Sequence, residues 1–450
     1  MSYRGGKAIC WQYITRLYFA VLPLRLLPIG QQKMVRQSSV VLLLAIWSQC
    51  IAAEHWPDFR GPTLDGITNT TDVPIRWSES NNIAWKTAVP GRGWSTPVIT
   101  GPLLWMSSAE QEGHQLFAIA IDCKTGKIKH RILLFEIQNM EASNALNSYA
   151  SPSPVTDGQH VYFSFGTYGV AAVDARDGTK AWSRQDVNLD HQEGPGSSPL
   201  LCKNRLVLHC DGRDQQYVLA LDTATGKTVW RCKRSLDLSE VGDFARKAFT
   251  TALLVQLKGQ DRVISAAAQG CYCYDPATGR EIWSLRYPGF SAVPRPVASS
   301  EVAFVVDGFA NPSITAVELD GKGDITLSGV KWVFQRSGPA TTSPVRIFNQ
   351  LVFVTDNGVL TSLDEETGEL NWKKRIGGDF CSSPIVVGDL IYLFDRTGGS
   401  SVVRIAAKGG DPKVIATNRL DEGMMASPIA VGKTLYLRTK QHLYCVSEKN

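Results

Sequence analysis

The chain has 450 residues, 44% of them hydrophobic and 20% charged, a composition that supports a large core and excludes a disordered or fibrous protein. Its formal net charge of +5 comes from residues 1–53, which hold six basic and no acidic side chains and leave 41 Lys and Arg against 42 Asp and Glu in the rest. A nearly neutral mature chain has no field to attract nucleic acid or an anionic membrane, so we expect neither as a partner.

Residues 1–53 are predicted to be a leader for export. Arg36 precedes an apolar run over residues 40–47, and the small residues Ala52-Ala53 follow, in the order typical of a signal peptide. Because this pattern is complete from Met34 onward, we expect Met34 to be the start. The apolar run is too short to span a bilayer, and no later segment is long and apolar enough. We therefore expect a mature chain without a transmembrane segment, located in the periplasm or elsewhere outside the cytoplasm.

Residues 54–80 form a short segment that we expect to pack on the domain that follows, which spans residues 81–450. That domain begins with a strand-like run, Ile83–Val89, which carries Trp85. After this run, one repeated unit fills the rest of the chain.

The repeated unit consists of a Ser/Thr-Pro pair, three apolar strands separated by turns, an Asp-x-x-Thr-Gly turn and a Trp. Its clearest copy starts at Ser198-Pro199 and ends with Thr225-Gly226 and Trp230. Repeats of 40 to 50 residues with four short strands each are typical of propeller blades. The sequence therefore predicts an all-β, eight-bladed β-propeller of four-stranded antiparallel blades. The eight equivalent starting positions, 40 to 57 residues apart, are Pro97, Pro154, Pro199, Ala252, Pro296, Pro344, Pro384 and Pro428.

The recurring Gly and Trp residues are interpreted as structural. Gly supplies the positive φ of a tight turn, and the Trp on the next strand has enough surface to seal one blade against its neighbour. These residues are Gly178, Gly226, Gly279 and Gly368 with Trp182, Trp230, Trp283, Trp332 and Trp372.

The cysteines indicate no clear metal site, disulfide or lipidation site. Cys271 and Cys273 flank Tyr272 in a strand-like run, so their side chains share one face and could be metal ligands or small buried side chains. We favour the buried reading, because no His follows at zinc-finger spacing, and we expect no metal. Disulfide pairing stays open. Lipidation of Cys50 also stays open, although residues 47–49 before it fit a lipoprotein signal poorly.

The last copy predicts how the ring closes. It contains only three strand-like runs, Ile429–Val431, Thr434–Arg438 and His442–Val446. The run Ile83–Val89 would supply the missing outer strand and join the two ends of the domain. Such closure removes exposed sheet edges.

The pattern Ala-x-Asp-x-x-Thr-Gly-x-x-x-Trp at Ala220–Trp230 resembles the PQQ-type repeat of the quinoprotein alcohol dehydrogenase superfamily, with its tryptophan-docking motif, which also occurs in BamB-like proteins. Ala172–Trp182 is a variant of it, with Asp177-Gly178 at the turn. The segment Trp56–Pro62, followed by Asp65-Gly66, is similar to the N-terminal signature of exported PQQ-binding-like β-propeller repeat proteins. The resemblance implies the propeller fold, but a fold does not determine an activity.

The resemblance also implies what an active quinoprotein would need, namely adjacent cysteines under PQQ and a calcium ion held by Glu, Asn and Asp. The chain has no Cys-Cys pair and no motif that would supply the calcium ligands. We therefore expect no cofactor, and PQQ with calcium remains the alternative.

A candidate ligand site falls on the loops that converge at the channel mouth, where the innermost strands begin and where the second and third strands join. A His beside carboxylates can act as an acid or base, although the same residues also suit solvated turns. The candidate residues are Asn147, Tyr149, His191, Glu193, His209, Asp211, Arg213, Asp214, Arg295 and Asp379; no catalytic residue is assigned.

Two functions remain open. The first is an exported, non-catalytic propeller, expected to be monomeric, that binds a protein, small ligand or carbohydrate at its top face or channel mouth. The second is an enzyme at the same mouth, either a PQQ-dependent oxidoreductase or a carbohydrate-active enzyme. The sequence favours the first, because it contains no nucleophile elbow, phosphate-binding loop or His-Glu-x-x-His helix.

Overall fold

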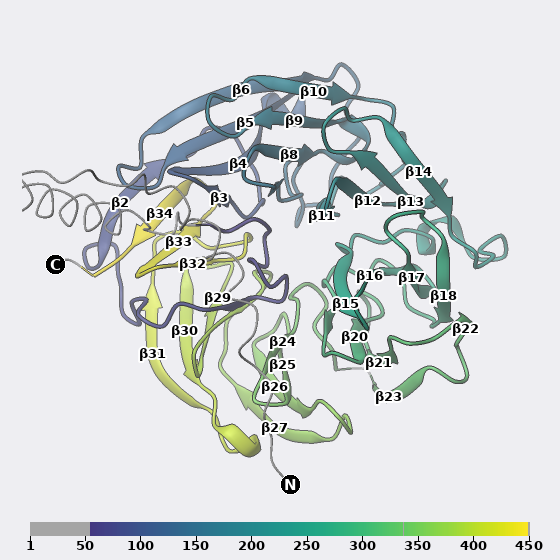
Figure 1. Cartoon of the computed structure of the whole chain (residues 1–450). Coiled ribbons are helices and arrows are strands. Elements are labelled where there is room, and N and C mark those ends of the chain that lie inside the picture. Colours follow the sequence, from purple (N-terminus) through teal and green to yellow (C-terminus); the bar gives the residue numbers. More distant parts are fainter. Residues whose placement is uncertain (1–54, 336, 449–450) are drawn as a thin grey trace, which may run out of the picture. The chain divides into compact units, whose positions relative to one another are not determined.

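Eight β-sheets form a ring in the computed structural model, which describes residues 55–335 and 337–448. The predictions on the leader, on Met34 and on Cys50 lie outside these residues. In each of six sheets, four consecutive strands run from the centre of the ring outward (Figure 1) and pair antiparallel. The all-β, eight-bladed propeller is confirmed. No helix within the described residues is long and apolar enough to cross a membrane.

Each blade starts where the repeat predicted. The innermost strand begins directly after the recurrent Pro, or after Ala252 in the fourth blade. Pro suits this position because the first residue of a strand can lack a ladder donor. The strands of blades one to four are β3 (Val98–Thr100), β4 (Leu103–Glu110), β5 (Gln115–Asp122), β6 (Ile128–Glu136); β7 (Val155–Thr156), β8 (His160–Ser164), β9 (Val170–Asp174), β10 (Lys180–Arg184); β11 (Leu200–Cys202), β12 (Arg205–Asp211), β13 (Gln216–Asp222), β14 (Thr228–Lys233); and β15 (Leu253–Leu257), β16 (Gln260–Ala267), β17 (Gly270–Tyr274), β18 (Glu281–Arg286).

The remaining blades follow the same order. Blades five to eight consist of β19 (Val297–Ala298), β20 (Val302–Val306), β21 (Ile314–Glu318), β23 (Val330–Phe334); β24 (Val345–Ile347), β25 (Gln350–Val354), β26 (Val359–Asp364), β27 (Leu370–Arg375); β28 (Ile385–Val387), β29 (Leu390–Phe394), β30 (Gly399–Arg404), β31 (Lys413–Arg419); and β32 (Ile429–Val431), β33 (Thr434–Arg438), β34 (His442–Val446) with β2 (Ile83–Ala88). Two short strands pair parallel at sheet edges, β22 (Gly323–Asp324) with β18 and β1 (Ile67–Thr68) with β28. The short 3-10 helices are η1 (Gln111–Gly113), η2 (Gly166–Tyr168), η3 (Asp243–Ala245) and η4 (Ala407–Gly409).

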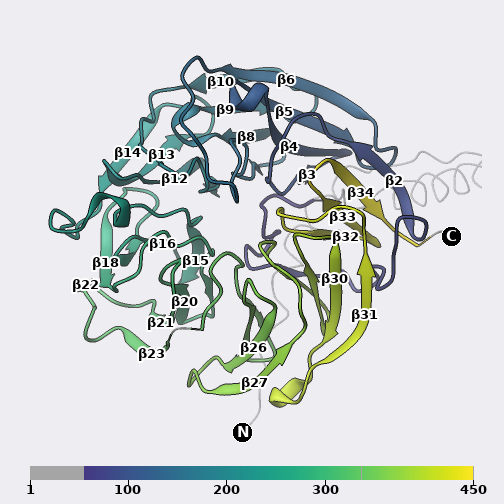
Figure 2. The ribbon, with the colours of Figure 1, turned by 180° about the vertical axis from the view of Figure 1, so that it is seen from behind.

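The ring closes between its first and last strands. β2 pairs antiparallel with β34, from Ile83 opposite Val446 to Ala88 opposite His442. Figure 2 shows the purple β2 beside the yellow β34 from the opposite side. The expected closure by this run is confirmed.

The core lies between the blades. Each of eight clusters of buried apolar residues fills the space between two neighbouring blades, and the last joins blade eight to blade one. Cys271 and Cys273 are both fully buried in the cluster between blades four and five, and neither forms a disulfide. Because every blade shares its apolar surface with two others, its burial depends on the complete ring.

The repeated Trp side chains contact the Gly turn of the following blade. Trp182 lies so close to Gly226 that a Cβ there would sit 2.6 Å from the indole, and Gly226 has a φ of +68°. The indole nitrogen of Trp182 donates to the carbonyl of Thr223 at 2.8 Å. Trp230 meets Gly279 and Trp332 meets Gly368 in the same way, whereas Trp283 donates to the carbonyl of Leu319 and Trp372 packs in an apolar cluster with Ile405. At Gly178 the nearest side chain is that of Ile132, and Trp105 and His130 lie beyond it.

Candidate ligand-binding cavity in the central channel

A ring of hydroxyl groups surrounds the central channel at the start of the innermost strands. Seven of the eight residues before the repeated Pro or Ala are Ser or Thr, and each side-chain oxygen accepts the backbone N–H of the equivalent residue one blade before it, at 2.8 to 3.2 Å. We call these residues the hydroxyl ring: Thr96, Ser153, Ser198, Thr251, Ser343, Ser383 and Ser427. Because each oxygen accepts an amide proton, its own proton can be donated to a ligand.

Arg295 occupies the eighth position and fills it differently. Its Nε donates to the carbonyl of Ala252 at 3.0 Å, and its Nη1 contacts the carboxylate of Asp58 at 2.6 Å. The two side chains are 0% and 4% exposed. A buried cation requires such a partner, so this Arg ties the ring to the segment that contains Asp58.

Residues 56–68, which we call the floor segment, cross the channel below the hydroxyl ring. Trp56 pairs with Ile99 of blade one, and the carbonyl of Pro57 accepts the N–H of Thr156 in blade two. β1, at the end of the segment, pairs with β28 of blade seven. In Figure 1 this purple segment runs through the middle of the ring.

Arg60 anchors the floor segment on the opposite side of the channel. Its guanidinium donates to the carbonyls of Pro384 at 2.6 Å and Pro344 at 3.3 Å, and also to that of Asp65 at 2.8 Å. Complete burial lowers the pKa of Arg60 to about 10, although Asp65 and Asp58 act in the opposite direction. The channel is thus crossed by a segment bound to blades on both sides.

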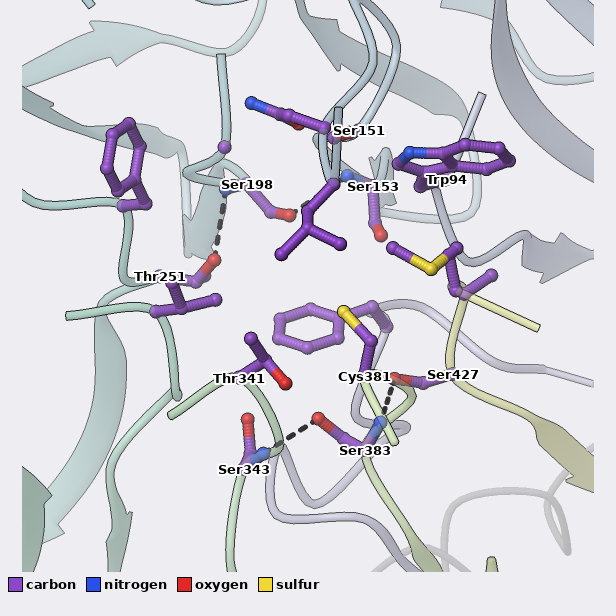
Figure 3. A pocket seen from close by; sticks show the side chains of 18 of the residues that line it. Trp94, Ser151, Ser153, Ser198, Thr251, Thr341, Ser343, Cys381, Ser383 and Ser427 are labelled. Carbon is purple, nitrogen blue, oxygen red and sulfur yellow. Dashed lines mark hydrogen bonds between the residues drawn. The ribbon is translucent and has the colours of Figure 1, made fainter. Parts of the chain in front are cut away.

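The space between the hydroxyl ring and the mouth is a cavity of about 280 Å³. Figure 3 shows Ser198, Thr251 and Ser383 among the residues around it. Phe59 of the floor segment, Trp94, Phe249, Val293 and Met425 give the lining a largely apolar character. Among the described residues that line the cavity, Glu193 is the one Asp, Glu, His, Lys or Arg. The cavity thus offers apolar surface and hydroxyl donors, with little charge.

Two of the predicted site residues line this cavity. The side-chain amide of Asn147 donates to the carbonyls of Glu193 at 2.8 Å and Pro195 at 3.1 Å, which fixes the loop before blade two to the loop before blade three. The carboxylate of Glu193 accepts from the amide of Asn144 at 2.8 Å and lies 3.7 Å from the ammonium of Lys247.

The other predicted residues lie elsewhere. His209 and Asp211 are buried between blades three and four, where Asp211 binds Arg234. Arg295 is buried below the mouth. The remaining placements are as follows: Tyr149 donates to the carbonyl of Glu141, Arg213 pairs with Asp190, Asp214 accepts the N–H of Asp190, Asp379 pairs with Arg396, and His191 is buried beside Thr167. These residues do not form one polar mouth, because most of them satisfy contacts within a single loop or blade.

The sequence interpretation missed most of the apolar lining. Phe59, Trp94 and Met425 lie on separate irregular segments, and no local pattern brings them together. The hydroxyl ring is visible in the sequence, because Ser or Thr recurs before the repeated Pro. This Ser/Thr-Pro pair was interpreted only as the start of a strand.

The groups around the cavity can be compared with what each enzymatic alternative requires. Among the described residues, no three His, Cys, Asp or Glu side chains are grouped as a metal site, and no Arg or Lys lines the cavity to bind the carboxylates of PQQ. Glycoside hydrolysis commonly needs two carboxyl groups, whereas Glu193 stands without a second one in this lining. The residues present do not fit PQQ with calcium.

His191 should make the protein sensitive to acid. Burial lowers the pKa of His191 to about 4, and its Nε2 accepts the backbone N–H of Thr167 at 3.1 Å. An unfolded His titrates near pH 6.5, so the unfolded chain binds a proton that the folded chain excludes, and stability falls as pH drops from about 6.5 to about 4. In His191→Gln, which keeps an acceptor, the loss between about pH 7 and pH 5 should be smaller by about 2 kcal/mol.

Urea unfolding at the two pH values measures this difference, with His160→Gln as the matched control for loss of an imidazole. An unchanged pH dependence in His191→Gln would show that His191 is not the acid-sensitive group.

The fold and the cavity define an eight-bladed propeller built from PQQ-like repeats. The family model described as "Outer membrane protein assembly factor BamB" matches residues 67–192, 119–214 and 214–450. These matches cover most of the chain, and the protein belongs to this family.

Curated relatives are similar over part of their length. The outer membrane protein assembly factor BamB of Salmonella typhimurium is 27% identical over 277 residues, which are 58% of this chain and 65% of that protein. BamB of Legionella pneumophila is 27% identical over 175 residues, or 36% of this chain and 41% of that protein. The chain therefore matches less than two thirds of the length of these relatives.

Solved structures show the same fold. BamB from Moraxella catarrhalis superposes with a TM-score of 0.57 at 12% identity, covering 81% of this chain and 99% of that one. Quinohemoprotein alcohol dehydrogenase from Comamonas testosteroni gives a TM-score of 0.61 at 12% identity, covering 88% of this chain and 81% of that one. A propeller of this kind thus occurs in an assembly factor and in an enzyme, so the fold does not decide between them.

Proposed function

We propose that this protein is an exported, non-catalytic propeller that acts in the cell envelope by binding part of another polypeptide in its central cavity. Its family is described as an outer membrane protein assembly factor. The observation that carries the proposal is the lining of the cavity, in which apolar side chains and hydroxyl donors surround a space with a single carboxylate. Such a lining suits an apolar side chain and its backbone carbonyl better than it suits acid–base chemistry.

The dimensions of the cavity support a small part of a polypeptide as the ligand. A space of about 280 Å³ accepts a few side chains and excludes a folded domain. Leu146 and Phe309, which line it, are 40% and 42% exposed, so apolar surface is available without rearrangement. Apolar contacts of this kind favour binding because they remove surface from water.

Filling the cavity should abolish this binding. In Val293→Trp, a half-buried lining residue gains an indole that occupies the space, and affinity for an unfolded outer-membrane β-barrel polypeptide diluted from urea should fall about tenfold or more. Fluorescence anisotropy of the labelled polypeptide measures the change. Val414→Trp is the matched control, since Val414 is 39% exposed on the outer strand β31.

Equal binding by both variants would place the interaction outside the cavity and contradict the proposal. Retention of PQQ by the protein in the presence of Ca²⁺, together with reduction of a dye by alcohols, would contradict the non-catalytic assignment.

A further inference from the structure

A second depression opens beside the central cavity on the same face. This depression, which we call the side groove, has a volume of about 610 Å³ and lies over loops of blades one, two, seven and eight. Trp94, Leu146 and Met425 line both spaces. The side groove therefore adjoins the cavity, and these three side chains form the boundary between the two spaces.

The walls of the side groove are held in place by backbone pairing. Arg92 pairs with Ala109 through hydrogen bonds of 2.8 and 2.9 Å. An equivalent bridge joins Phe380 to Asp395 in blade seven, and another joins Met424 to Thr439 in blade eight. In each case the connection that enters a blade is fixed to the end of its second strand, as at Ala109, or to the turn that follows this strand, as at Asp395 and Thr439. A groove built in this way does not need to be ordered by the ligand, which favours affinity.

The side groove is positively charged. Arg92, Arg396 and Lys440 line it, against the single carboxylate of Asp379. Asp379 is already paired with Arg396. Within the described part of the chain, Arg92 and Lys440 have no ion-pair partner.

Arg92 is oriented by its surroundings. Its guanidinium lies 5.0 Å from the centre of the Trp94 ring and donates to the carbonyls of Ala145 and Asn147 at 3.3 and 3.2 Å. The nearby carboxylate of Glu422 accepts from the hydroxyl of Thr439 at 2.7 Å and also binds His442, and it adds a second negative charge beside Asp379, so the three basic side chains of the groove remain in excess by one. Positive charge is thus fixed at the edge of an apolar, hydroxyl-lined cavity.

We propose that the natural ligand is an extended acidic polypeptide segment, which places an apolar side chain in the central cavity and acidic side chains in the side groove. This inference rests on the proposed function and adds the chemistry of the partner. Backbone carbonyls of such a segment would accept from the hydroxyl ring, and its carboxylates would meet Arg92 and Lys440. The floor segment limits how deep the ligand can reach, so the rest of it must lie along the groove.

Synthetic peptides of 12 residues test the inference on the full-length protein. One labelled peptide carries a central Phe flanked by Glu residues; a second replaces each Glu with Gln; a third replaces the Phe with Ser. At an ionic strength of about 50 mM, the first should bind about tenfold more tightly than either of the others, and the difference from the Gln peptide should shrink at about 500 mM.

Charge reversal at one lysine locates the contact. Lys440→Glu should weaken binding of the acidic peptide about tenfold and leave the Gln peptide nearly unchanged. Lys433→Glu is the matched control, because Lys433 is also exposed in blade eight but lies in the turn between β32 and β33, at the other end of the strands.

Each outcome decides a different claim. Preference for the acidic peptide that is lost in Lys440→Glu supports the inference. Equal binding of the Glu and Gln peptides, blocked by Val293→Trp, overturns the acidic partner and retains the proposed function. No peptide binding at all, or binding that Val293→Trp does not change, overturns both.

Discussion

Replacing Asp211 with asparagine is expected to lower the free energy of unfolding by about 3–5 kcal/mol, because it leaves a buried cation without its counter-charge. Arg234 is 4% exposed and donates to the two oxygens of Asp211 at 2.7 and 2.6 Å. It also donates to Ser265 at 3.0 Å, which lies in the neighbouring blade. The Asp211→Asn variant keeps the shape of the side chain and removes only the charge. Urea unfolding near pH 7 measures the loss.

The effect should depend on pH in a defined direction. Burial alone would raise the pKa of Asp211, but the charge of Arg234, followed by that of His209, outweighs burial and lowers this pKa to about 2. An unfolded Asp titrates near pH 4, so the stabilisation is present above about pH 4 and is lost as pH falls toward about 2. The difference between wild type and Asp211→Asn should therefore narrow in acid.

Two controls separate this network from surface charge. Asp320→Asn removes the carboxylate of an exposed pair with Lys258 and should leave stability nearly unchanged. Adding Arg234→Met to Asp211→Asn should recover part of the loss, since it removes the unpaired cation. If Asp211→Asn were as stable as Asp320→Asn, the buried pair would contribute nothing to the junction of blades three and four.

The second large effect is expected at the floor of the channel. Asp58→Asn removes the carboxylate that pairs with Arg295 and that also acts on the buried Arg60, so stability should fall by about 3–5 kcal/mol. The floor segment should also detach before the ring unfolds, because it loses its ion pair with blade five. Trypsin cleavage after Arg60 measures this detachment, since Arg60 is fully buried in the native protein.

Asp72→Asn provides the matched control, as Asp72 is an exposed carboxylate in the same N-terminal stretch. Cleavage after Arg60 should be faster in Asp58→Asn than in this control, while cleavage within the blades stays slow. Equal rates at Arg60 would mean that the ion pair does not retain the segment.

The fold could be predicted from the sequence because each blade is specified by one short stretch of consecutive residues. Each recurrent Pro marks the first strand of a blade, and the same short turn pattern precedes the outer strand in five of the eight copies, with Asp177-Gly178 as a variant in one of them. Even the closure by Ile83–Ala88 could be inferred, since the last copy lacked a strand. Agreement among many copies corrects the ambiguity of any single one.

The site could not be predicted in the same way. Asp58 meets Arg295 and Arg60 meets Pro384 across hundreds of residues, and no repeat relates these partners. Polarity alone also misled the interpretation, because His209 and Asp211 look like residues of a mouth yet satisfy one another inside the protein. A buried polar network and a binding site use the same residue types, and only their surroundings distinguish them.

Residues 56–68 give the channel a dead end. The segment contacts blades on both sides of the channel, so a partner chain bound as we propose would enter as a tip, a bend or a terminus and would leave by the same route. Under the proposed function, the ring would hold a client at one face and release it from that face, rather than act as a conduit.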